Sequence, residues 1–177
     1  MSTPSLWRRE HLLVLGWAET GVALARLAEE IRDSGFRPTV VVGITRGGLP
    51  AAVALSNLLD IEDFRMLGIP RNTSNSRYSK RGQPFLDFVA PDRPMTGADV
   101  LIVDDIMGDG GTMSLAVDTV RMLGAARVRT AVLVRNVHAA GRPDHLALEA
   151  DDWIVFPWEK PPQEGERSVT APLPDAR

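Results

Sequence analysis

Three short runs of apolar residues mark the interior of the chain. They span residues 40–44, 100–103 and 131–134, and valine and isoleucine dominate them. Each run is continuous rather than alternating, and each is too short for a buried helix, which is typical of strands that are covered on both faces. The pattern therefore predicts the inner strands of a parallel sheet.

Between these runs, the apolar positions follow a helical period. Segments 24–31 and 113–120 each place four apolar residues at i, i+3, i+4 and i+7, on one face of a helix. A shorter helix is expected from Pro50 to Leu59, with the proline in its first turn. Strands and helices alternating in this order predict an α/β fold, with a central parallel β-sheet flanked by helices.

Two segments break the periodic pattern. Residues 70–84 are polar, basic and aperiodic, and a loop of that length is usually functional or disordered. Residues 161–177 are rich in proline, glutamate and glycine, which predicts a disordered tail. No internal repeat is visible, so we expect one domain over residues 1–160.

Composition and charge narrow the functional classes. The 177 residues carry a net charge of −3 and include no cysteine and three histidines. No general basic field is present to attract nucleic acid, and disulfides, thiolate metal sites and a cysteine nucleophile are excluded. No apolar run reaches about 18 residues and no signal-peptide pattern is seen, so we expect a cytoplasmic protein without a membrane-spanning helix. Because the chain as a whole is not basic, an anion-binding site would need positive groups gathered in one place.

The strongest chemical motif follows the second apolar run. Asp104 and Asp105 end the predicted strand, and a glycine-rich turn over residues 108–111 leads into a helix that begins at about Thr112. Backbone N–H groups in such a turn bind anions, and Thr112 is placed to cap the helix or to donate its hydroxyl to a phosphate. The two acids suit sugar hydroxyls or a divalent cation that a ligand holds. The alternative is a plain strand-to-helix turn with an acidic rim.

A second turn of the same kind follows the first apolar run. In residues 45–48, which read Thr-Arg-Gly-Gly, Arg46 stands between the end of a strand and the start of a helix. An anion there would meet both a guanidinium and backbone N–H groups, although an arginine on a surface turn is the alternative. Both turns lie at the carboxyl ends of strands, where open α/β sheets bind ligands. Together they predict one ligand with two anionic ends and a polar middle.

Three segments resemble the type I phosphoribosyltransferase family. Residues 100–112 resemble its signature for phosphoribosyl pyrophosphate (PRPP), residues 45–48 resemble the pyrophosphate loop of its xanthine-guanine branch, and residues 151–160 resemble the C-terminal hood of that branch. The resemblance extends from about Trp17 to Lys160. It implies the type I phosphoribosyltransferase fold, with a small hood at about residues 136–160. It also implies transfer of the 5-phosphoribosyl group from PRPP to a guanine, xanthine or hypoxanthine type of base, with release of pyrophosphate, in purine salvage.

The resemblance assigns a role to each motif. Residues 108–112 would bind the 5′-phosphate, Asp104 and Asp105 would hold the ribose hydroxyls and Mg²⁺, and the loop around Arg46 would bind pyrophosphate through a cis peptide between Thr45 and Arg46. The implied catalytic residues are Arg46, Asp105 and Asp109. The implied PRPP-binding residues are Thr45, Arg46, Gly47, Asp104, Asp105, Gly108, Asp109, Gly110, Gly111 and Thr112.

The resemblance also implies a flexible loop and a base site. Ser76, Arg77 and Tyr78 would contact the substrate from the loop at residues 70–84. Trp153 would stack on the base and the Ile154 backbone would bind the base edge, whereas the alternative for Trp153 is a core aromatic. Arg135 would contact the 6-oxo group, and the alternative is a solvated arginine at a strand end. Trp158 is expected to be structural.

The sequence departs from the family at Gly108 and Asp109, where 6-oxopurine enzymes usually have Asp and Thr. A carboxylate close to a phosphate is repulsive unless it is protonated, bridged by a metal or turned away. Three interpretations follow: Asp109 replaces the lost base contact, the base needs no such contact, or the protein binds another ligand. The alternatives to a purine enzyme are therefore a regulatory PRPP- or nucleotide-binding protein and a phosphoribosyltransferase for another base. We expect PRPP and a nucleobase as partners, no nucleic acid or membrane, and a homodimer or homotetramer.

Overall fold

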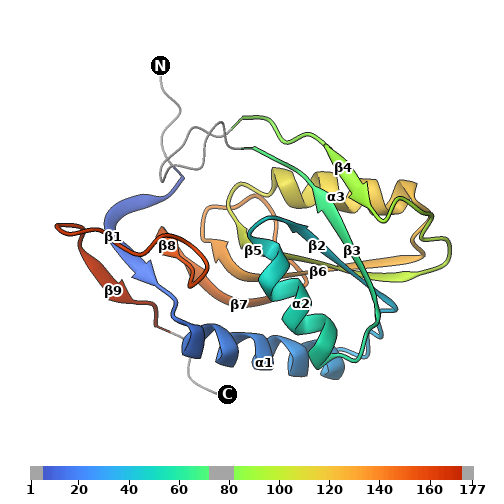
Figure 1. Cartoon of the computed structure of the whole chain (residues 1–177), viewed down its shortest axis with the longest axis horizontal. Coiled ribbons are helices and arrows are strands. Elements are labelled where there is room, and N and C mark those ends of the chain that lie inside the picture. The colour runs from blue at the N-terminus through green and yellow to red at the C-terminus, as the bar shows by residue number, and fades with distance from the viewer. Residues whose placement is uncertain (1–5, 72–81, 173–177) are drawn as a thin grey trace.

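The computed structural model describes residues 6–71 and 82–172, and a six-stranded sheet forms its centre (Figure 1). The strands lie in the order β4-β3-β2-β5-β6-β7, and every neighbouring pair is parallel except β3 and β4. Their bounds are β2 (Val40–Thr45), β3 (Asp63–Gly68), β4 (Phe88–Ala90), β5 (Asp99–Met107), β6 (Arg127–Asn136) and β7 (His145–Ala150). The predicted central parallel sheet is confirmed, with an antiparallel strand added at one edge.

Helices cover both faces of this sheet. α1 (Trp17–Asp33) and α2 (Gly48–Leu58) lie on one face, and α3 (Gly111–Met122) lies on the other (Figure 1). Along β5, Leu101 and Val103 pack into the core beside α1 and α2, whereas Val100 and Ile102 pack into the core beside α3. All four side chains are fully buried, because both faces of the strand are covered. That burial explains the continuous apolar run.

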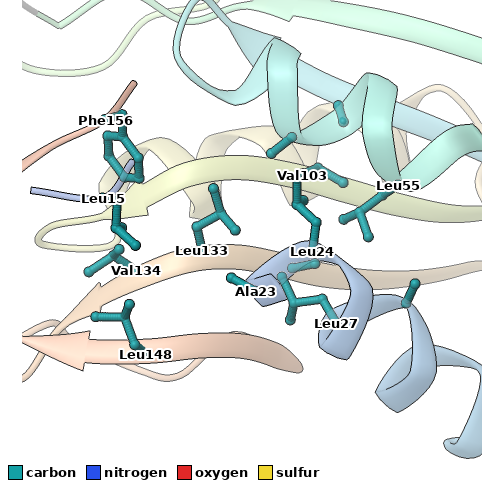
Figure 2. Close-up of a cluster of buried hydrophobic side chains, with 14 of the residues drawn as sticks. Leu15, Ala23, Leu24, Leu27, Leu55, Val103, Leu133, Val134, Leu148 and Phe156 are labelled. Atoms are coloured by element: carbon teal, nitrogen blue, oxygen red, sulfur yellow. The ribbon is translucent and has the colours of Figure 1, made fainter. Parts of the chain in front are cut away.

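The hydrophobic core on the α1 and α2 face also includes side chains from outside the six-stranded sheet. Figure 2 shows Leu24 of α1 and Leu55 of α2 close to Val103, and Phe156 close to Leu15 at the other end of the cluster. Leu15 and Phe156 are almost completely buried. The segment that carries the predicted hood is thus packed onto the same core as the helices.

A second, three-stranded sheet forms the hood. β1 (Arg8–Val14) lies between β8 (Asp152–Val155) and β9 (Ser168–Thr170), and both pairs are parallel. β9 lies in the tail that was expected to be disordered, and that expectation is wrong for this strand. The Ala171 N–H donates to the Val14 carbonyl at 2.9 Å, and Ala171 is 2% exposed. The side chains of β9 are all exposed, so its backbone pairing left no apolar pattern in the sequence.

The expected elements differ from the observed ones mainly at their ends. The short helix expected from Pro50 to Leu59 begins two residues earlier, at Gly48, and ends at Leu58. Within the described residues, no helix has the length and apolar character needed to cross a membrane.

Candidate active site

The loops that follow β2 and β5 touch at the carboxyl edge of the sheet. A Cβ atom placed on Gly47 would lie 1.9 Å from Oδ2 of Asp105, and one placed on Gly48 would lie 2.8 Å from the Asp104 Cα. Real Cβ contacts are longer than 3.0 Å, so a side chain at Gly48 would push against the backbone of β5, and one at Gly47 would displace the Asp105 carboxylate. The two glycines therefore allow the predicted anion loop and the paired acids to share one site.

Asp104 and Asp105 lie side by side in the floor of this site. Each is 9% exposed, and the Asp105 backbone N–H donates to Oδ1 of Asp104 at 2.9 Å. Burial raises the pKa of Asp105, and the hydrogen bonds that its carboxyl group receives offset only part of that rise. The site therefore holds a carboxylate that gains from an approaching positive charge.

This acidic pair suits a cation that arrives with a ligand. No group of three or more histidine, cysteine, aspartate or glutamate side chains that would enclose a metal ion occurs among the described residues. Mg²⁺ is usually bound by one or two carboxylates together with substrate phosphates and water, rather than by a complete protein cage. Asp104 and Asp105 provide this number and kind of ligand.

The loop after β2 has the features expected of an anion site. The peptide between Thr45 and Arg46 is cis, as the resemblance implied. α2 begins directly after the loop, its N-cap is Gly47 without a side-chain cap, and its first turn has no acidic residue. The positive end of the α2 dipole therefore lies directly after the loop that carries the exposed Arg46.

The loop after β5 turns sharply into α3. Gly110 is the N-cap of that helix and has a φ of 93°, and a Cβ there would lie 2.8 Å from the Ala140 carbonyl oxygen. Both the positive φ and the close approach require glycine. α3 starts at Gly111, so Thr112 is inside the helix and does not cap it. Its role as a phosphate-binding hydroxyl stays a prediction.

Asp109 extends from this loop toward Arg71, the residue at the edge of the predicted flexible loop. The two side chains form a bidentate ion pair at 2.5 and 2.7 Å, and Oδ1 of Asp109 also accepts the Gly111 N–H at 2.9 Å. The carboxylate is therefore neutralised by a guanidinium. Arg71 was given no specific role from the sequence; its signals were its positive charge and its place at the start of the basic 70–84 segment.

Arg135 organises the loop that follows β6. Its Nε and Nη2 donate to the carbonyls of Gly141 and Ala139, and its Nη1 donates to Glu149, each at 2.9 Å. The side chain is 13% exposed, so the alternative of a solvated strand-end arginine is wrong. Three of its five N–H donors are used in this way. The contact with a base stays a prediction.

Trp153 and Ile154 lie on β8, at the edge of the hood sheet. Trp153 is half-buried and Ile154 is buried, and both pack against the core on the α1 and α2 face. The Leu15 N–H donates to the Val155 carbonyl at 3.0 Å. Because successive residues of a strand direct their backbone groups to opposite sides, the N–H and C=O of Ile154 face away from β1.

Trp158 belongs to an aromatic group beside the acidic pair. Its ring stacks on Phe156 with centroids 5.0 Å apart and meets the edge of Trp17 at 6.1 Å. Its buried indole N–H forms no hydrogen bond of normal geometry within the described part of the chain, yet it opposes the rise in the pKa of Asp105. Trp158 thus packs the hood close to the acids. Ser76, Arg77 and Tyr78 lie outside the described residues.

Comparison with known proteins gives consistent matches. The family model described as "Phosphoribosyl transferase domain" matches residues 16–164. The bifunctional protein PyrR of Chloroflexus aurantiacus is 34% identical over 135 residues, which are 71% of this chain and 72% of the relative. The adenine phosphoribosyltransferase of Francisella tularensis subsp. novicida is 30% identical over 125 residues, or 68% and 70% of the two chains. The crystal structure of a purine phosphoribosyltransferase from Pyrococcus horikoshii superposes with a TM-score of 0.74 at 28% identity, covering 88% of this chain and 99% of that one.

Proposed function

Because the chain belongs to the phosphoribosyl transferase domain family, we propose that it transfers the 5-phosphoribosyl group of PRPP to a purine base. The acceptor is a base of the guanine, xanthine or hypoxanthine type, and the second product is pyrophosphate. In this reaction a ring nitrogen of the base bonds to C1 of the ribose while the bond from C1 to the pyrophosphate oxygen breaks. We place this chemistry in purine salvage.

The observation that carries the proposal is the contact between the two loops. Gly47 and Gly48 lie directly on Asp104 and Asp105, so a group bound by the Arg46 loop is within reach of the acids. A ligand with pyrophosphate on one side, a ribose in the middle and a 5′-phosphate at the α3 loop matches that order of donors and acceptors. All the groups that the proposal assigns to PRPP therefore lie at one edge of the sheet.

The residues then divide the work of the reaction. The transition state carries positive charge on the ribose and negative charge on the leaving pyrophosphate. The buried carboxylate of Asp105 stabilises the former, and Arg46 with the N-terminus of α2 stabilises the latter. Asp104 and Asp105 would also hold Mg²⁺, which neutralises charge on the leaving pyrophosphate when it is bound.

The hood supplies the proposed base site. The backbone groups of Ile154 face the unpaired side of β8, where they can form hydrogen bonds with a base edge, and Trp153 lies beside them on the same strand. Gly108 provides no carboxylate for the base, and Asp109 pairs with Arg71. Recognition of the base therefore rests on the hood and the loop that Arg135 organises.

Release of pyrophosphate tests the proposal. The full chain is incubated with PRPP, Mg²⁺ and one base at a time, with guanine, xanthine, hypoxanthine, adenine and uracil as the panel. We expect release with a 6-oxopurine. Asp105→Asn should reduce it at least about a hundredfold, as is common when a charge-stabilising group is lost. Asp99→Asn, which removes the charge of the aspartate that pairs with Arg127 at the start of β5, is the control and should retain activity. No release with any base sinks the proposal.

A second candidate is a regulatory protein that binds PRPP or a nucleotide without turnover. The observation that favours it is the glycine at position 108, together with an Asp109 carboxylate already paired with Arg71. Tight binding of PRPP with no pyrophosphate release identifies this case. Release with uracil or adenine alone identifies a transferase for another base. We also expect a homodimer or homotetramer, which sedimentation velocity measures directly.

A further inference from the structure

Asp109 already occupies donors that the 5′-phosphate of the proposed substrate would use. Oδ1 accepts the Gly111 N–H, which is the first N–H of α3, and both oxygens accept from the guanidinium of Arg71. A helix N-terminus and an arginine are the donors that proteins generally use for a phosphate. In this structure both donors are hydrogen-bonded to the Asp109 carboxylate of the protein itself.

The surroundings of Gly111 show how closely Asp109 and Arg71 lie to the start of α3. A Cβ placed on Gly111 would be 3.4 Å from Oδ1 of Asp109, 3.5 Å from Cγ of Pro84 and 3.6 Å from Nη1 of Arg71. The Arg71 side chain is 15% exposed, whereas that of Asp109 is 46% exposed. The guanidinium is therefore held at the mouth of the loop, and the carboxylate is the group that has room to turn outward.

Arg71 is fixed in this position by contacts that do not involve Asp109. Its Nε donates to the Gly82 carbonyl at 3.1 Å, and the Gly82 N–H donates to the Arg71 carbonyl at 2.7 Å. These bonds hold the backbone and one edge of the guanidinium. The edge formed by Nη1 and Nη2 faces Asp109.

We propose that Asp109 is an internal competitor for the 5′-phosphate and that Arg71 is the phosphate ligand that it releases. When a phosphorylated ribose binds, the phosphate takes the Gly111 N–H and the free edge of Arg71, and the Asp109 carboxylate turns to solvent. A dianionic phosphate can replace a carboxylate at these donors, whereas a sugar hydroxyl cannot, so the exchange favours phosphorylated sugars. The inference rests on the proposed function only in identifying residues 108–112 as the phosphate site.

Ribose 5-phosphate is the probe, since its binding requires no base, pyrophosphate or turnover. Isothermal titration calorimetry with the full chain compares wild type, Asp109→Asn, Arg71→Met and the double variant. We expect Asp109→Asn to bind ribose 5-phosphate about tenfold more tightly and Arg71→Met to bind it about tenfold more weakly, as is typical of a hydrogen bond to a charged group. In the double variant the gain from Asp109→Asn should be smaller than with Arg71 present, because only the Gly111 N–H remains to be released.

The ion pair between Asp99, which is 18% exposed, and Arg127, which is 62% exposed, provides matched controls. It is also bidentate, at 2.7 and 2.5 Å, and it lies at the opposite ends of β5 and β6 from the site. Asp99→Asn and Arg127→Met should leave ribose 5-phosphate binding unchanged. Thermal unfolding of each variant reports whether it is folded, and if Arg71→Met is not, Arg71→Lys takes its place and should bind less tightly than wild type.

The outcomes separate this inference from the proposed function. Unchanged or weaker binding by Asp109→Asn overturns the competition, and unchanged binding by Arg71→Met overturns the role of Arg71. Tighter binding by Asp109→Asn without pyrophosphate release from any base supports the exchange while the enzyme proposal fails. Pyrophosphate release without any effect of the two variants on ribose 5-phosphate leaves the enzyme proposal standing and removes the exchange.

Discussion

The contact between Gly48 and the backbone of β5 can be tested by adding one methyl group. In Gly48→Ala, the new Cβ would lie 2.8 Å from both the Asp104 Cα and the Val103 carbonyl oxygen, and 2.9 Å from Oδ1 of Asp104. Two of these three atoms belong to the backbone of a central strand whose side chains are buried on both faces. Because the backbone cannot yield cheaply, the methyl group forces α2 away from the sheet, and overpacking of this kind costs about 1–3 kcal/mol.

Gly21→Ala supplies the reference for this measurement. Gly21 lies inside α1, and a Cβ there meets no atom within 4 Å. The substitution should stabilise the protein by about 0.4–1 kcal/mol, because alanine loses less chain entropy in a helix than glycine. The difference between the two variants removes much of this helix effect and leaves the steric cost of about 1–3 kcal/mol.

Urea unfolding followed by tryptophan fluorescence gives both free energies of unfolding. Thermal unfolding checks them, because each kcal/mol corresponds to about 2–4 °C for a chain of this size. We expect Gly48→Ala to unfold at a lower urea concentration than wild type and Gly21→Ala at a higher one, with unchanged slopes. If the two variants are equally stable, the α2 loop does not lie on β5 as closely as described, and the argument for a shared site fails.

Three further perturbations address the acids and the edge of the sheet. Gly47→Ala brings a Cβ to 1.9 Å from Oδ2 of Asp105, so it should turn that carboxylate aside. Pyrophosphate release should fall at least about tenfold, with a smaller loss of stability than in Gly48→Ala. Equal rates of release for Gly47→Ala and wild type contradict this. Burial raises the pKa of Asp105, so its contribution to stability is complete below its unfolded pKa and is lost as the pH rises through its folded pKa. Asp105→Asn should therefore raise the melting temperature at pH 7 but not at pH 3, and equal effects at both pH values argue against this cause. Arg65→Met should cost about 2–4 kcal/mol in urea unfolding, because the 4% exposed Arg65 donates to Asp63 and to the carbonyls of Arg93 and Pro94. A loss below about 0.5 kcal/mol would show that these bonds contribute little.

The inner strands could be predicted from the sequence because helices cover both their faces. Val100 to Val103 form a continuous apolar run for this reason, and a parallel sheet was the direct interpretation. β3 was missed because Arg65 interrupts its apolar pattern. Its charge is compensated by Asp63 and by the carbonyls of Arg93 and Pro94, which come from a segment about 30 residues later. Local patterns contain no sign of such a partner.

In the candidate site, too, the features with a local sequence pattern were predicted and those that depend on distant partners were not. The two glycine-rich turns were predicted because glycines between a strand and a helix are a local pattern, and the positive φ of Gly110 requires one of them. The bidentate pair of Arg71 with Asp109 joins residues 38 positions apart, and its geometry depends on how β3 and β5 are placed in the sheet. Two partners of Arg135, Ala139 and Gly141, lie in the turn after β6, and the third, Glu149, lies on β7; no local sequence motif indicates this arrangement. Side chains that bridge separate loops were therefore beyond sequence reasoning.

The arrangement of the hood has a consequence for how the chain folds as it is synthesised. β1 is made first, but both of its neighbours, β8 and β9, are made after residue 150. The six-stranded sheet has all its strands once β7 has left the ribosome, whereas the backbone of β1 waits without its sheet partners until residues 152–170 follow. The carboxyl edge of the six-stranded sheet, where we propose that PRPP binds, can thus form before the hood strands are in place. A nascent chain that stalls between β7 and β8 carries an unpaired strand near its N-terminus, which is the kind of edge that chaperones bind or that leads to aggregation.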